Sequence, residues 1–245
     1  MAVAAFAGAA CGLRAQGGPP MVTDDPGTPG DRHWEINLAW TDQRTPGQTL
    51  EGIPLLDANY GVGDRIQLNY MASWNVLRTA GEASESGASD SQFAVKWRFY
   101  DAGETGLQVS TYPRITFVNP GSGSDRRGTA DPGTSFLVPF EVRRDFGVVS
   151  VNAEIGHAFS NAARDRGWIA GLCVGREVSK GWEVDAEVYD TGSDSMDRNE
   201  VLVDAGTRFD LSGHATLLLA IGRDTHNSLS PKLSLLTYAG IQIRI

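Results

Sequence analysis

The stretch RIQLNYMASW, residues 65–74, alternates apolar with polar side chains, and Met71 is its one exception. Successive side chains of an extended strand lie on opposite faces, so Ile66 and Leu68 share one face while Gln67 and Asn69 share the other. The same alternation recurs along the chain from residue 34 onward. It predicts an all-β protein whose sheet has one apolar and one polar face.

Twelve strands of this kind are predicted, and six long polar loops alternate with five tight turns between them. The expected strands are residues 34–41, 50–60, 65–74, 91–100, 107–118, 134–143, 148–159, 167–178, 182–189, 201–209, 215–223 and 233–245. A membrane barrel has this rhythm because one rim carries short turns and the other carries long loops, whereas a soluble β-sandwich has no reason to keep it. We therefore predict a transmembrane antiparallel up-and-down β-barrel of about 12 strands over residues 33–245, with both termini periplasmic.

The apolar face is expected to contact lipid. Twelve strands enclose a wide lumen, which rows of apolar side chains would have to fill if they pointed inward. Charged side chains of both signs can instead pair around a wet or plugged interior. Aromatic belts at the two bilayer interfaces are also expected, because the tryptophans share the apolar face and lie near strand ends. They are Trp34, Trp40, Trp74, Trp97, Trp168 and Trp182.

Composition excludes some classes of protein. The formal net charge of −9 argues against nucleic-acid binding, and no run of 18 apolar residues predicts a helical span. Residues 1–17 look like a signal peptide that ends in the small-x-small sequence Ala15-Gln16-Gly17, although its basic start is missing. Residues 18–32, rich in Gly, Pro and Asp, are expected to be an extended lead-in. Export and a barrel together predict the outer membrane of a Gram-negative bacterium.

The polar face supplies the candidate substrate-binding residues, which are expected to line the lumen. They are Arg65, Gln67, Asn69, Lys96, Arg98, Tyr112, Arg114, Glu141, Glu154, Glu183, Asp185, Glu187, Asp204 and Arg208. Glu183, Asp185 and Glu187 recur with a period of two. They either form a ladder that selects cations or pair with inward arginines such as Arg208, and pairing is favoured because inward bases are as numerous as inward acids.

No catalytic residue, metal site or cofactor is expected, because the chain has no phosphate-binding glycine loop, metal-ligand spacing or nucleophile elbow. Outer-membrane phospholipases use a serine and a histidine on the barrel exterior, where His157 is expected. By strand parity Ser135 and Ser160 point inward, so His157 lacks a serine partner. The acids of residues 190–200 are expected to be solvated rather than to hold Ca²⁺, and Cys173 is expected to be a small strand residue.

The hairpin PLLDANYGVGDRIQL, residues 54–68, resembles one in a family of bacterial outer-membrane β-barrels. This family is that of the MetA pathway of phenol degradation, whose members are also described as transporters. VSTYPR (residues 109–114) and the final YAGIQIRI (residues 238–245) are similar to it too, and the resemblance covers about residues 20–245. It implies an outer-membrane barrel that takes up aromatic or hydrophobic compounds. Ile245 departs from the aromatic last residue by which the barrel-assembly machinery recognises many such proteins.

Three functions are open on this basis. The first, which is favoured, is a passive channel or uptake protein for small, aromatic or hydrophobic solutes, with outer-membrane lipid, solute and the assembly machinery as its partners. The second is a barrel without transport, a structural or surface-interaction protein whose inward charges close the lumen. The third is a lipid-acting enzyme, although no enzyme is predicted.

Overall fold

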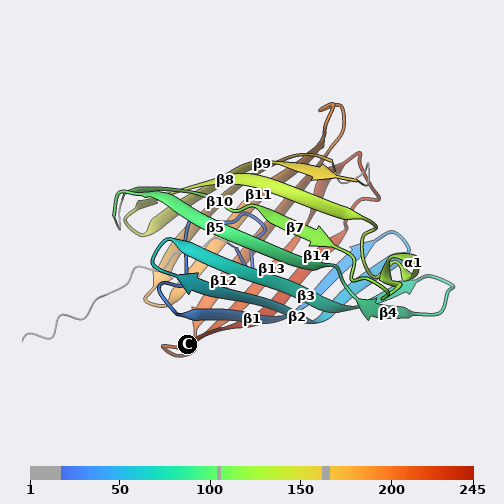
Figure 1. Cartoon of the computed structure of the whole chain (residues 1–245), viewed down its shortest axis with the longest axis horizontal. Helices are drawn as coiled ribbons and strands as arrows, with labels where there is room; N and C mark the ends of the chain where they lie inside the picture. The colour runs from blue at the N-terminus through green and yellow to red at the C-terminus, as the bar shows by residue number, and fades with distance from the viewer. Residues whose placement is uncertain (1–17, 104–105, 162–165) are drawn as a thin grey trace, which may run out of the picture.

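The computed structural model describes residues 18–103, 106–161 and 166–245, which form a closed antiparallel β-barrel (Figure 1). The expected signal peptide, residues 1–17, lies outside the described residues. The described strands are β1 (Trp34–Thr45), β2 (Gln48–Val62), β3 (Ile66–Thr79), β4 (Glu85–Ala88), β5 (Ser91–Asp101), β6 (Leu107–Thr111), β7 (Arg114–Phe117), β8 (Thr134–Phe146), β9 (Val149–Ser160), β10 (Gly167–Ser179), β11 (Trp182–Ser193), β12 (Asn199–Asp210), β13 (Ala215–Asn227) and β14 (Leu235–Arg244). A short helix, α1 (Ser124–Arg127), lies between β7 and β8.

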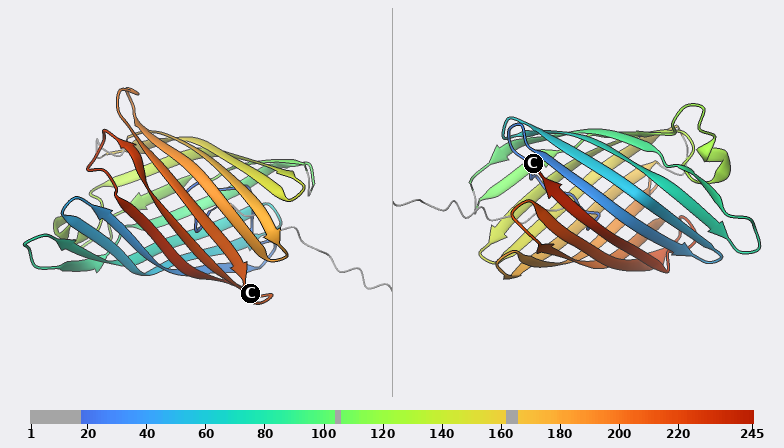
Figure 2. Two further views of the ribbon diagram at one scale, coloured as in Figure 1. Left: turned by 180° about the vertical axis from the view of Figure 1, so that it is seen from behind. Right: turned by 90° about the horizontal axis from the view of Figure 1, so that it is seen from below.

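The barrel closes because β1 pairs with β2 on one side and with β14 on the other (Figure 2). The strands β6 and β7 are two halves of one barrel strand, since both lie between β5 and β8. The strand β4 pairs only with the loop end of β3. The wall therefore consists of twelve antiparallel strands in sequence order, and the predicted fold is confirmed.

The strands run beyond the ranges that hydrophobic alternation predicts. The first expected loop, residues 42–48, shrinks to a two-residue turn, because β1 ends at Thr45 and β2 begins at Gln48. Side chains here are polar on both faces, so the sequence pattern fades while the backbone ladder continues, with Asp42 opposite Glu51. For the same reason β4 lies in a segment that was expected to be a loop, and the short helix α1 lies in another such segment, between Gly123 and Gly128.

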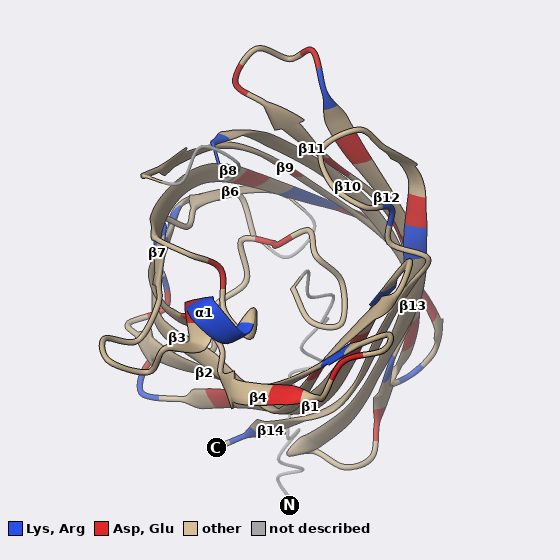
Figure 3. Ribbon diagram, turned by 90° about the vertical axis from the view of Figure 1, so that its right-hand side faces the viewer, with Lys and Arg blue, Asp and Glu red and all other residues tan. Residues whose placement is uncertain are grey.

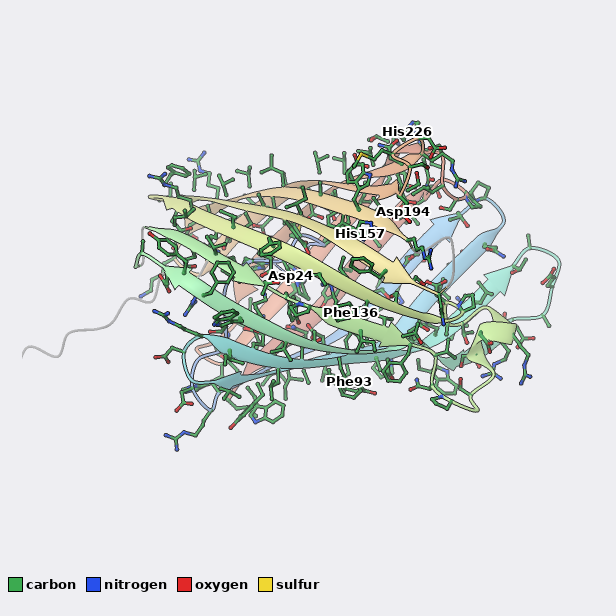
Figure 4. All side chains as sticks on the ribbon, turned by 45° about the horizontal axis from the view of Figure 1, so that its top comes forward. Asp24, Phe93, Phe136, His157, Asp194 and His226 are labelled. Atoms are coloured by element: carbon green, nitrogen blue, oxygen red, sulfur yellow. The ribbon has the colours of Figure 1, made fainter. Side chains whose placement is uncertain are left out.

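The two faces of the wall are chemically distinct, as predicted. Leu68 and Ile155 are 45% and 63% exposed on the outer face, whereas the polar side chains next to them in sequence, Gln67, Asn69 and Glu154, are buried inward. Apolar side chains project from the outside of the wall, among them Phe93 and Phe136 (Figure 4). A bilayer, and not water, matches a surface of this kind. The described residues include no helix long and apolar enough to cross a membrane.

The segment before β1 enters the barrel. Figure 3 looks along the lumen and shows this segment inside the ring of strands. Met21, Thr23, Asp25 and Pro26 are buried there. The sequence predicted an extended lead-in without a position, and the structure places it in the lumen.

The lipid-facing assignment predicts the cost of a charge on the outer face. Leu172 lies midway along β10 and Val178 lies near its end, and each is 50% exposed. Leu172→Arg should lower the free energy of unfolding from a bilayer by about 2–4 kcal/mol, and Val178→Arg by about 0–1 kcal/mol, because the cost depends on depth. Urea titration of protein folded into phospholipid vesicles measures both; equal effects of the two substitutions would contradict the assignment.

Candidate functional site in the lumen

Residues 18–26, which we call the lumen segment, pack against the inner wall through one apolar side chain. Met21 lies in a buried cluster with Cys173, Leu218 and Ala220. The wall leaves space for it, because a Cβ atom on Gly206 would lie 2.6 Å from the Met21 sulfur. Likewise, a Cβ atom on Gly171 would lie 2.3 Å from the Thr23 hydroxyl oxygen. Two glycines of the wall thus make room for the lumen segment.

Backbone amides of the lumen segment donate to two wall carboxylates. Val22 and Thr23 donate to the two oxygens of Glu187, at N···O distances of 3.1 and 2.6 Å. Asp24 donates to Glu154 at 3.2 Å. A buried carboxylate needs such donors, because burial removes the water that would otherwise solvate its charge.

The two aspartates of the lumen segment meet basic side chains of the wall. Arg114 lies between Asp24 and Glu154 and makes an ion pair with each, at 2.8 Å in both cases. Arg143 contacts Asp25 at 3.0 Å and Asp145 at 2.7 Å. Each arginine therefore joins one acid of the lumen segment to one acid of the wall.

Lys96 completes this cluster from β5. Its ammonium group donates to the Asp25 carbonyl oxygen at 2.5 Å and lies 3.6 Å from the Asp24 carboxylate and 3.7 Å from that of Glu141. The Tyr112 ring supports it, with the Lys96 nitrogen 4.6 Å and the Arg114 guanidinium carbon 5.4 Å from the ring centroid. Tyr112 lies where β6 and β7 are interrupted, beside a proline that cannot donate to the strand ladder.

Beside the basic cluster, the inner wall is rich in amides, and Gln67 lies directly across from Lys96 in the ladder of β3 and β5. Asn37 and Asn69 donate to Asp57 at 2.8 and 2.6 Å, and Gln67 donates to Asn59 at 2.7 Å. A hollow of about 40 Å³ separates part of this wall from the lumen segment. A hollow of this size holds only a few water molecules, so the segment lies close to this part of the wall.

The chain leaves the lumen through contacts with the β2–β3 turn. The Arg32 amide donates to the Gly61 carbonyl at 2.9 Å, and the Gly63 amide donates to the Asp31 carboxylate at 2.9 Å. The Gly63 amide and the Arg32 guanidinium lower the pKa of the exposed Asp31 carboxyl. These contacts fix the end of the lead-in at one rim.

The acidic residues of β11 all point inward but have different neighbours. Glu183 lies opposite Arg208 in the register of β11 and β12, whereas Glu187 lies opposite another acid, Asp204. Within the described residues, the hydrogen bond that Arg208 donates goes to the Gly18 carbonyl, at 2.7 Å. The expected pairing with arginine therefore fits the geometry of Glu183 and not that of Glu187.

Most of the expected lumen residues are buried in the barrel. They are Gln67, Asn69, Lys96, Tyr112, Glu141, Glu154, Glu183, Asp185, Glu187, Asp204 and Arg208, and Arg114 is partly buried beside them. Whether these residues bind a solute stays a prediction. The sequence analysis did not place Asp24 and Asp25 in the lumen. The pattern that could have indicated it is a pair of aspartates in the lead-in, followed by strands whose lysine and arginine side chains point inward.

Two expected lumen residues lie at the short-turn rim instead. Arg65 is exposed in the tight turn, because β3 begins one residue later than predicted, and its placement in the lumen was wrong. Arg98 is directed to the same rim, where it contacts Asp101 at 3.2 Å and donates to the Asp64 carbonyl at 2.7 Å. One turn carbonyl, that of Asp64, and the carboxylate of Asp101 at the end of β5 hold the Arg98 guanidinium at this rim.

His157 lies on the outer side of the wall beside Phe136 and Asp194 (Figure 4). Its Nε2 is 2.9 Å from the Asp194 carboxylate, and its ring centroid is 4.6 Å from that of Phe159. Within the described residues its Nδ1 has no hydrogen-bond partner, and Ser160 donates to the Thr134 carbonyl instead. A serine hydrolase requires a serine within hydrogen-bond reach of the histidine, and the part of the chain that is described does not assemble one.

The acidic loop residues have partners within the chain. Asp194 contacts His157, and Asp190 accepts hydrogen bonds from Asn199. Hydrogen bonds from Ser195 and Ser193 lower the pKa of Asp197. Among the described residues, the acids close enough to share a cation are Asp24, Glu141 and Glu154, and Lys96 and Arg114 already neutralise them.

Comparison with known proteins identifies the fold. No protein-family model matches the chain, and no curated protein sequence matches it. Among solved structures, the chain is similar to the COG4313 outer membrane channel from Pseudomonas putida F1, with 12% identity, a TM-score of 0.72 and coverage of 90% of this chain and 98% of that one. It is also similar to the KdgM porin in complex with disordered oligogalacturonate, with 8% identity, a TM-score of 0.60 and coverage of 84% and 98%. At these identities the likeness establishes a shared barrel fold.

The Arg114 ion pairs predict a large loss of stability on truncation. Arg114→Leu leaves the buried Glu154 carboxylate without its cation, so the free energy of unfolding should fall by about 3–5 kcal/mol. Arg126→Leu, at an exposed position of α1, serves as the control and should change it by less than about 0.5 kcal/mol. Urea titration in vesicles measures both, and a loss at Arg114 no larger than that of the control would show that the pairs do not stabilise the barrel.

Proposed function

We propose that the protein is a passive channel for small solutes in the outer membrane of a Gram-negative bacterium. The observation that carries this proposal is the lumen, because the strands direct polar side chains inward along the wall and apolar side chains outward. A barrel of this kind places a hydrophilic path across a bilayer. Two structures with the same fold support the proposal, since one is described as an outer membrane channel and the other as a porin.

The charge of the lumen favours cations and neutral solutes over anions. The sequence predicted inward bases as numerous as inward acids, and this was wrong for the buried wall, where acids outnumber bases. The acids are Asp42, Asp57, Glu141, Glu154, Glu183, Asp185, Glu187, Asp204 and Asp224, and the bases are Lys96, Arg143 and Arg208. An excess of inward carboxylates attracts cations into a pore and repels anions.

The class of solute follows from the same wall. Charged and amide side chains dominate the buried inner face, which suits polar solutes better than plain hydrocarbons. The resemblance to the family of the MetA pathway of phenol degradation adds aromatic compounds to the candidate solutes. We therefore propose small polar or cationic solutes, including aromatic ones that carry a polar group.

A barrel without transport is the second candidate, and the lumen segment favours it. Ion pairs and hydrogen bonds connect this segment to several wall strands, which closes part of the lumen. A permanently closed barrel would serve as a structural or surface protein. Conductance separates the two functions.

Planar-bilayer recording tests the channel. The full chain and the D24N/D25N variant, in which the lumen segment loses its ion pairs, should both conduct. In a KCl gradient the reversal potential should show a preference for K⁺ over Cl⁻, because the wall is acidic. The triple substitution E183Q/D185N/E187Q should reduce that preference, and the control E82Q/D125N should leave it unchanged. Absence of conductance from both the full chain and the D24N/D25N variant would exclude the channel.

A further inference from the structure

We propose that the lumen segment is the gate of this channel: residues 18–26 block the pore when they are docked and open it when they leave the wall. The proposal rests on the proposed channel function. The inner wall of the barrel is the binding surface, and the lumen segment of the same chain is its partner.

The docked segment reaches wall strands that lie far apart in the sequence. Its contacts are Lys96 on β5, Arg114 on β7, Arg143 on β8, Glu154 on β9, Glu187 on β11 and Arg208 on β12. Figure 3 shows the segment inside the ring of strands rather than along one side of the rim. An occupant held in this way obstructs the path of a solute.

The wall is shaped to receive the segment. Gly171 lies beside Thr23 and Gly206 lies beside Met21, and a side chain at either glycine would collide with the segment. The charges also match, since Arg114 and Arg143 meet Asp24 and Asp25 while Glu187 meets backbone amides. Complementary shape and charge together indicate a built binding site rather than loose filling of the lumen.

The wall keeps its ion pairs when the segment leaves. Arg114 still contacts Glu154, Arg143 still contacts Asp145, and Lys96 still lies near Glu141. The two aspartates of the segment regain water on release. Neither state therefore leaves a basic group of the cluster without an acid. Glu187 and Glu154 lose the amide donors of the segment on release, and water that enters the vacated lumen replaces them, so a two-state element can switch.

The chain also has a pivot for this movement. The contacts of Arg32 with Gly61, and of Asp31 with Gly63, hold the end of the lead-in at the rim. The Thr28 hydroxyl also donates to the Asp64 carbonyl of this turn at 2.9 Å, so the anchor begins at residue 28, and Gly27 lies between it and the lumen segment. The segment can leave the wall while its C-terminal end stays attached.

Two full-chain variants weaken docking by independent means. D24N/D25N removes the charges of the segment, and G171V places a side chain where Thr23 docks without changing any charge. Each should raise the open fraction in single-channel recordings by about tenfold or more, because each removes a buried interaction. The control E82Q/D125N removes the same number of negative charges at exposed positions, one between β3 and β4 and one in α1, and should leave the open fraction unchanged.

A disulfide tests the docked state directly. A Cβ atom at residue 171 would lie 3.2 Å from that of Thr23, close to the separation of about 3.5–4.5 Å found in disulfides. T23C/G171C, made with Cys11 and Cys173 replaced by serine, should be closed when oxidised and should open on addition of dithiothreitol. The single variant T23C in the same background should not respond to the reductant.

The outcomes separate the gate from the channel. Full conductance in the oxidised double-cysteine variant, or equal open fractions in the full chain, D24N/D25N and G171V, would overturn the gate while leaving the channel intact. Absence of conductance from every variant would exclude the channel, and the gate with it.

Discussion

Within the hydrocarbon region of the bilayer, the polar side chains of this barrel can point only into the lumen. Every backbone amide in the hydrocarbon region must find a partner within the protein, so the sheet has to close, as it does where β1 meets β14. Closure gives each strand a lipid face and a lumen face. Leu68 and Leu172 contact lipid for the same reason that Gln67 and Cys173 point inward, because neighbouring residues of a strand face opposite ways.

Inward charges then need partners, and the lumen segment supplies some of them. Arg114 between Asp24 and Glu154 shows the arrangement most clearly, with both distances at 2.8 Å. The wall has more buried acids than bases, and the backbone amides of Val22 and Thr23 satisfy one of those acids, Glu187. The lumen segment, which has no regular secondary structure, thus balances some of the charges that line the pore.

The sequence predicts those features of the fold that a repeat of two residues within a single strand determines. Strand number, closure and the two faces follow from alternation, since a period of two is visible within one strand. Arg65 shows the limit of this reasoning, because one residue at a strand end decides whether a side chain enters the lumen or stays at a turn. Beyond the bilayer, as in β4, alternation disappears although the backbone still pairs.

Docking of the lumen segment depends on contacts that no local pattern records. Thr23 and Glu187 are 164 residues apart in the chain, and the segment has neither periodicity nor strand propensity. The contact between His157 and Asp194 is of the same kind, joining a strand to a loop 37 residues away. Such pairs become visible only once the barrel brings the strands together.

Spin labels at successive positions of β3 test the arrangement of the two faces most directly. Single cysteines at residues 66, 67, 68 and 69 would carry the label in vesicles, and power-saturation EPR would compare collisions with oxygen and with a water-soluble nickel chelate. Oxygen, which partitions into lipid, should dominate at residues 66 and 68 and not at 67 and 69. The reverse phase, or no alternation, would contradict the account.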